Sequence, residues 1–124
     1  MQNYQIKRFH VEALILSCFL NQNRTLELDK LEFETYKLPF ELFKASNTTK
    51  MIAKAIKLFQ DENKPIDDIL IQDFIESKTD KLNVDEYLEI MSYCWCSFDT
   101  MISYLNVLKE INKEDEKRKL LDEL

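Results

Sequence analysis

The order of apolar and polar positions along the chain predicts an almost entirely helical protein. Residues 9–20 carry apolar groups on all sides, which is typical of a helix at the centre of a bundle, and we expect this first helix to span about residues 6–21. A later helix, behind an N-cap cluster at residues 47–49, shows the clearest periodicity. Its apolar residues recur at the i, i+3, i+4 and i+7 positions of one face: Ile52, Ala55, Ile56 and Phe59.

The segment between these two helices is less regular. Polar residues at 21–23 end the first helix. A short helix or irregular stretch is expected next, and its apolar residues are Leu26, Leu28, Leu31 and Phe33. Pro39 is well placed to begin a new helical turn, and Phe40 and Phe43 behind it share one face.

The stretch ENKPIDDILIQDFIES, residues 62–77, predicts that one helix stops and another starts. Pro65 pushes Lys64 out of helical geometry. Asp67 can cap the next helix, because its carboxylate accepts hydrogen bonds from the first free amides and suits the positive end of the helix dipole. We expect the buried stripe of that helix to consist of Ile66, Leu70, Ile71, Phe74 and Ile75.

Two further helices complete the pattern. Asn83, with Glu86 three positions later, forms a start similar to a capping box. The helix behind it is expected to direct Tyr87, Leu88 and Met91 inward. The last helix begins near Asp99, and its apolar seam contains Met101, Tyr104, Leu105, Leu108 and Ile111.

The end of this last helix changes character. Residues 112–119 hold no apolar side chain, but pairs of opposite charge four positions apart, such as Glu114 with Arg118 and Asp115 with Lys119, are compatible with a solvated helix. Three leucines at one-face spacing then follow: Leu120, Leu121 and Leu124. They either form a surface for another protein or dock on the chain's own bundle.

Composition supports this helical interpretation. The chain has 124 residues, no glycine and two prolines, so turns that need glycine at positive φ are poorly served. We predict an all-α fold, a small orthogonal bundle of about six helices that leads into a long C-terminal helix or an incomplete helical hairpin. Residues 1–100 form the bundle and residues 101–124 form the C-terminal helix of the same domain.

Net charge and hydropathy restrict the possible partners. A formal charge of −6 and a pI near 4.9 disfavour direct binding to DNA or RNA. The compact basic candidates are Lys7 with Arg8, and residues 117–119. The apolar run at 13–20 is too short to cross a bilayer, and we expect no membrane contact. Three cysteines without a secretory signal indicate reduced thiols and a cytoplasmic location.

Candidate catalytic and metal-binding residues have simpler explanations. Cys94, Cys96, Cys18 and His10 add up to four zinc ligand types. However, residues 10 and 18 of one helix lie about 12 Å apart, whereas ligands of one zinc ion lie roughly 4 Å apart. We expect His10 to be partly buried, and the acidic pairs at 67–68 and 85–86 to serve as helix starts. The sequence therefore predicts no catalytic residue, metal or cofactor, and no enzyme activity in this chain.

The order of elements from LPFELFKASNTTKMIAKAIKLFQDENKPIDDILIQDFIES through YLEIMSY to MISYLNVLKEINKEDEKRKLL resembles the N-terminal domain of DnaB-type bacterial replicative helicases. The most pointed matches are KPID and the run from YLNVLKE to KRKLL. Residues 92–98 have no counterpart in that family, and its usual glycines are absent. The helicase-binding C-terminal domain of DnaG-type primases is similar in fold and is the runner-up.

The resemblance implies a non-catalytic protein-interaction domain of the bacterial replication machinery. Such a domain would mediate helicase self-association, or couple the helicase to a primase or a helicase loader. An unrelated small acidic regulator that binds a host protein is the alternative from another class. We expect a homo-oligomer whose partner-binding residues all lie on the last helix: Tyr104, Leu105, Leu108, Ile111, Leu120, Leu121 and Leu124.

Overall fold

A computed structural model describes the backbone of residues 3–21, 27–93 and 97–124, and the side chains of these residues except 3–6 and 27–28. Every regular element in these ranges is helical, which confirms the predicted all-α bundle. The elements are α1 (Asn3–Leu20), α2 (Glu27–Thr35), the 3-10 turn η2 (Phe40–Leu42), α3 (Asn47–Asp61), α4 (Asp68–Lys78), α5 (Val84–Met91) and α6 (Phe98–Asp122).

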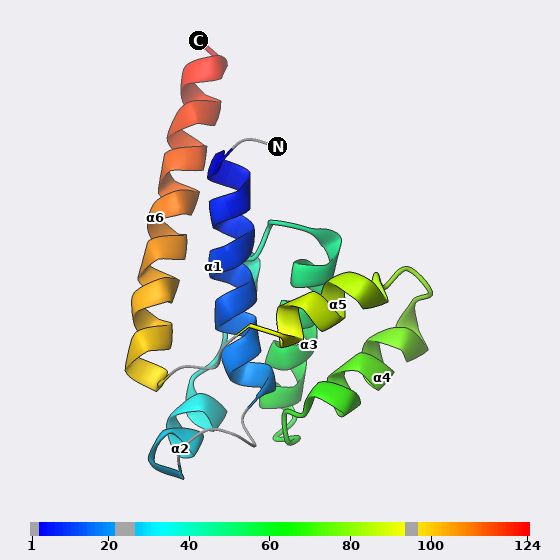
Figure 1. Cartoon of the computed structure of the whole chain (residues 1–124). Coiled ribbons are helices and arrows are strands. Elements are labelled where there is room, and N and C mark those ends of the chain that lie inside the picture. The colour runs from blue at the N-terminus through cyan, green and yellow to red at the C-terminus, as the bar shows by residue number, and fades with distance from the viewer. Residues whose placement is uncertain (1–2, 22–26, 94–96) are drawn as a thin grey trace.

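Helix α1 lies at the centre of the bundle (Figure 1). It packs against α6 on one side and against α3 and α5 on the other, while α4 contacts α3 from the outside. Helix α6 runs antiparallel to α1, and its C-terminal part extends past the N-terminal end of α1 (Figure 1). The last helix therefore both closes the core and projects from it.

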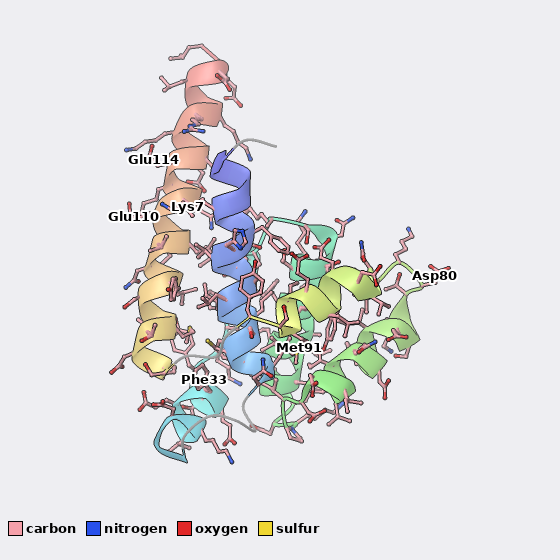
Figure 2. The ribbon with its side chains drawn as sticks, in the orientation of Figure 1. Lys7, Phe33, Asp80, Met91, Glu110 and Glu114 are labelled. Atoms are coloured by element: carbon pink, nitrogen blue, oxygen red, sulfur yellow. The ribbon has the colours of Figure 1, made fainter. Side chains whose placement is uncertain are left out.

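The apolar character of α1 explains its central position. Ala13, Ile15, Leu16, Cys18 and Phe19 are completely buried, as expected for a helix that is covered on several sides. One end of the core is closed by aromatic rings in edge-to-face contact, in which Phe33 from α2 touches both Phe19 and Phe98; Phe33 lies at the lower end of the bundle in Figure 2.

The N-cap of helix α3 lies one residue before the predicted cap cluster at residues 47–49. Its N-cap is Ser46, whose Oγ accepts a hydrogen bond from the backbone N–H of Thr49, while the Thr49 hydroxyl oxygen accepts one from the Ser46 N–H. Asn47 is already helical and exposed, so the cap lies just before the predicted cluster, although Thr49 of that cluster takes part in the capping box. The predicted apolar face of α3 is confirmed, because Ile52, Ala55, Ile56 and Phe59 are all buried.

The capping residue of α5 is confirmed, but its partner behaves differently from a capping box. Asn83 Oδ1 accepts a hydrogen bond from the Glu86 N–H at 3.0 Å. The Glu86 carboxylate accepts a hydrogen bond from the hydroxyl of Ser46. Glu86 thus links the N-terminal ends of α3 and α5.

The predicted stop and start at residues 62–77 is confirmed. The Lys64 N–H donates to the carbonyl oxygen of Phe59 at 2.9 Å, and Asn63 adopts a positive φ of 55° as the chain leaves α3. Asp67 then caps α4, accepting hydrogen bonds from the N–H groups of Ile69 and Leu70 at 2.9 and 3.1 Å.

Two predictions about inward-facing residues were wrong. Leu70 of α4 is 46% exposed, and Leu88 of α5 is 56% exposed. Helix α4 packs chiefly on α3, so only a narrow stripe of Ile66, Ile71 and Ile75 is covered and Phe74 is half-buried. On α5, Ile90 takes the buried position that we expected for Leu88.

Tyr87 joins α5 to the start of α4. Its phenol makes the free energy of unfolding vary with pH in the alkaline range. Its hydroxyl donates to the carbonyl oxygen of Asp68 at 2.6 Å. Burial raises the pKa of Tyr87 well above its usual value, and the negative charges of Asp68, Asp67 and Glu76 raise it further. The folded state therefore favours the protonated phenol, whose stabilising effect is complete below about pH 10 and is lost as the pH rises above that value.

We expect Tyr87→Phe to lower the free energy of unfolding by about 1 kcal/mol at pH 7, because the hydrogen bond to Asp68 is lost. The variant should then lose less stability than the parent chain between pH 9 and pH 11, since it has no phenol to ionise at this site. Urea unfolding at both pH values measures the two effects. Tyr36 and Tyr93 also have raised pKa values owing to burial, and both remain in the parent and the variant. Equal losses in the two proteins would contradict this assignment.

Candidate interaction surface

A polar cluster, formed by the buried Arg8, Glu12 and Asn112 and the partly exposed Asp115, fixes the position of α6. The side chain of Glu12 is completely buried and accepts a hydrogen bond from Arg8 Nη1 at 3.1 Å. It also accepts hydrogen bonds from the backbone N–H groups of residues 44 and 45, at 2.9 and 3.0 Å. One carboxylate therefore holds the turn between η2 and α3 against the middle of α1.

Arg8 extends this polar cluster to the last helix. Its Nη2 donates to Asn112 Oδ1 at 2.6 Å and to Asp115 Oδ2 at 2.8 Å. The Asn112 amide in turn donates from Nδ2 to the carbonyl oxygen of Leu42 at 3.1 Å. Because these charged and polar groups satisfy one another in a buried place, α6 has one defined register against α1.

The spacing of residues along the chain did not predict this cluster. Arg8 was counted as part of a basic patch, although it is buried, and Asn112 was assigned to a solvated segment, although it is buried as well. One sequence signal points to the cluster. Arg8 and Glu12 stand four positions apart, and Glu12 lies inside the apolar run of the first helix, where a charge needs a partner.

The end of α6 turns its apolar residues away from the core. Leu121 comes 13 residues after the buried Leu108, which corresponds to a rotation of about 140° around the helix axis. Leu124 follows just beyond the end of the helix and is exposed as well. The outer side of α6, where Glu110 and Glu114 project away from α1 in Figure 2, therefore continues into a leucine-bearing end.

We call Leu120, Leu121 and Leu124 the C-terminal leucine patch. Their exposed fractions are 65%, 66% and 101%. The alternative that these leucines dock on the chain's own bundle is wrong for this structure, because α6 stays helical as far as Asp122 and points them into solvent. Exposed leucines on neighbouring turns of a fixed helix are typical of a contact surface for another protein.

The structure divides the seven residues that we expected to bind partners. Leu105, Leu108 and Ile111 are buried against the bundle, so they stabilise the fold and are not accessible to a partner. The seam of the last helix is covered by α1 of the same chain. Tyr104 is half-buried against the core, and the leucine patch is the exposed part.

A second apolar feature is a groove between α3 and α4, which we call the α3–α4 groove. Its volume is about 180 Å³, and its lining consists of Met51, Lys54, Ala55, Leu58, Phe74, Ile75, Lys78 and Thr79. Leu58 is 39% exposed, and Met51 and Phe74 are half-buried. The groove thus offers apolar side chains between two lysines.

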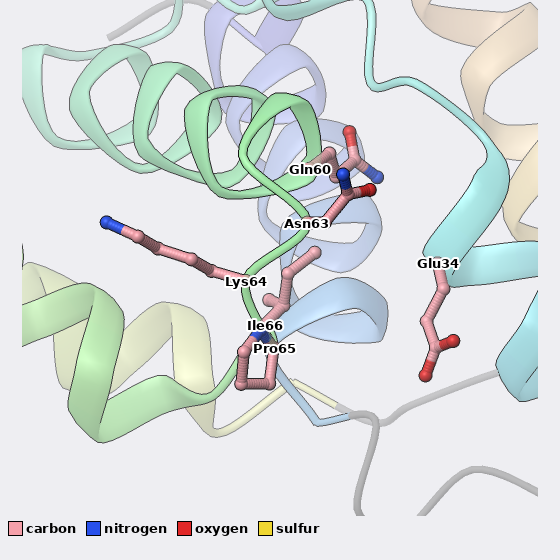
Figure 3. A pocket seen from close by; sticks show the side chains of 6 residues that line it. All are labelled: Glu34, Gln60, Asn63, Lys64, Pro65 and Ile66. Atoms are coloured by element: carbon pink, nitrogen blue, oxygen red, sulfur yellow. The ribbon is translucent and has the colours of Figure 1, made fainter.

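A third feature is a hollow of about 330 Å³ at the joint between α3 and α4 (Figure 3). Its walls are Glu34, Gln60 and residues 63–66. The Gln60 amide donates from Nε2 to the carbonyl oxygens of Phe33 and Tyr36, and its Oε1 accepts a hydrogen bond from the Leu38 N–H. Gln60 therefore holds the segment between α2 and η2. The polar side chain in the wall of the hollow thus has a structural role.

The candidate chemical residues are placed as follows. Cys18 is buried in the core, while Cys94 and Cys96 lie outside the described residues. His10 is exposed, contrary to the expected partial burial, because it lies on the solvent side of α1; its Nδ1 contacts the hydroxyl of Tyr93. Among the described residues, no three His, Cys, Asp or Glu side chains come together as metal ligands, and no helix is both long and apolar enough to span a membrane.

Comparison with known proteins gives no relative: no family model matches the chain, and no curated protein or solved structure matches it either.

Proposed function

We propose that this chain is a non-catalytic protein-interaction module that associates with other proteins, including copies of itself, through the C-terminal leucine patch. The observation that carries the proposal is the reversal of the apolar side within α6. The helix buries Leu108 and Ile111 in its own core. About two and a half turns after Ile111 it exposes Leu120 and Leu121 on a different side, and the exposed Leu124 follows just beyond its end.

The energetics suit a contact of moderate strength. A leucine side chain contributes roughly 1.5–3 kcal/mol when it is fully buried. The burial of three leucines can therefore offset part of the translational and rotational freedom that two chains lose when they associate. The polar cluster around Glu12 reduces the ordering cost, because it anchors the base of the projecting segment at Asn112 and Asp115 before any partner arrives.

The cellular role that we propose is the one that the resemblance to DnaB-type N-terminal domains implies. In this role the module would hold helicase subunits together, or couple a helicase to a primase or a loader, in the cytoplasm. An all-α bundle that leads into a long final helix is compatible with that role. Purified bacterial replicative helicase and primase are the partners to assay.

The leucine patch is tested by replacing two of its members. We expect Leu120→Ser with Leu121→Ser to weaken self-association at least tenfold, because both side chains would lose their apolar contacts. Sedimentation equilibrium over a range of protein concentrations measures the dissociation constant. The helix should remain folded, since both positions are more than 60% exposed.

A matched control is available on other helices. Leu31 of α2 and Leu88 of α5 are 67% and 56% exposed, so the double replacement of these two by serine removes a similar exposed apolar area. The control should associate like the parent chain. The proposal would be wrong if the parent is monomeric at every concentration and binds neither helicase nor primase, or if both double variants behave alike.

A further inference from the structure

We infer that the α3–α4 groove receives the C-terminal leucine patch of a second copy of this chain. This inference rests on the proposed function, and it names the surface that the patch contacts. The contact would be of the helix-in-groove type, in which leucines from one helix fill a gap between two others.

The chemistry of the groove matches that of the patch. Its lining combines the apolar side chains of Met51, Leu58 and Phe74 with the lysines Lys54 and Lys78. Within the described residues, no carboxylate pairs with either lysine, and the Lys78 ammonium lies over the Phe74 ring at 5.6 Å from its centroid. An apolar segment that brings its own acidic groups would complete this surface.

The end of α6 is such a segment. Its sequence LLDEL places Asp122 and Glu123 between the leucines of the patch. Burial of the leucines would bring the two carboxylates near the free ammonium groups of the groove, which fixes orientation more than it adds affinity. The apolar lining and the two lysines of the groove therefore both match the leucines and carboxylates at the end of α6.

The patch cannot reach the groove of its own chain. Helix α6 is continuous as far as Asp122, and its end lies beyond the N-terminal end of α1 (Figure 1). Helices α3 and α4 lie on the other side of α1, toward the opposite end of the bundle (Figure 1). Each copy consequently offers one patch and one groove to its neighbours, an arrangement that can extend beyond two subunits or close into a ring.

Complementation between two variants of the full chain tests this pairing. A patch variant carries Leu120→Ser and Leu121→Ser, and a groove variant carries Leu58→Glu, which puts a charge into the apolar lining. We expect each variant alone to self-associate at least tenfold more weakly than the parent chain. A mixture should restore one contact, because the groove variant supplies an intact patch and the patch variant an intact groove, so 1:1 dimers should appear by native mass measurement.

The control is Leu88→Glu, which adds the same charge at an exposed leucine outside the groove. Circular dichroism verifies that every variant is folded. If the folded groove variant self-associates like the parent, or if the mixture gives no dimer, the pairing is overturned while the leucine patch keeps its role with another occupant. A parent chain that stays monomeric and binds neither helicase nor primase would instead remove the proposed function itself.

Discussion

Replacement of Glu12 by alanine is expected to lower the free energy of unfolding by about 3–5 kcal/mol, the typical effect of removing one partner from a buried ion pair. The variant would leave the buried Arg8 guanidinium with only the partly exposed carboxylate of Asp115 and without that of Glu12. It would also leave the backbone N–H groups of residues 44 and 45 without their acceptor. Urea unfolding, followed by circular dichroism, measures the change.

Two companion variants keep this prediction testable even if Glu12→Ala does not fold. The exposed Glu116 of α6 is the matched control, and its replacement by alanine should change the stability by less than about 0.5 kcal/mol. The double replacement Arg8→Met with Glu12→Leu should be more stable than Glu12→Ala, because it removes both buried charges and refills their volume. Equal stability of Glu12→Ala and Glu116→Ala would contradict the role of the cluster.

The polar cluster matters for function because it connects the fold to the projecting helix. Arg8 of α1 holds Asn112 and Asp115 of α6, and the next turns of α6 lead directly to the leucine patch. A loosened cluster would let the end of α6 move relative to the bundle. Association through the patch would then require an additional ordering step.

The elements that local chemistry determines could be predicted from the sequence. Asp67 and Asn83 cap their helices as expected, because an acceptor at an N-cap needs only the amides of the next turn. Leu70 and Leu88 could not be assigned correctly from periodicity. Both lie on apolar stripes, but whether a stripe is covered depends on neighbouring helices that are distant in the sequence.

In the candidate surface, too, local features could be predicted from the sequence, whereas features that depend on packing could not. Spacing alone predicted that Leu120, Leu121 and Leu124 share one helix face. In the structure all three are exposed, Leu120 and Leu121 on the end of α6 and Leu124 just beyond it. The groove could not be found in this way, because α3 and α4 contribute its lining from separate segments. The cluster of Arg8 with Asn112 joins residues 104 positions apart, so only the packing of α1 on α6 reveals it.

Amide hydrogen exchange of the full chain, measured in dilute and in concentrated solution, tests the central claim most directly. Amides at residues 117–124 lie at the exposed end of α6 and should exchange through local fraying when the chain is dilute. At a total chain concentration of about 100 times the dissociation constant, roughly nine in ten patches should be occupied, so their exchange should slow about tenfold, while amides in the core of α1 change little. Protection that appears elsewhere on association, with residues 117–124 unchanged, would contradict the claim that the leucine patch is the contact surface.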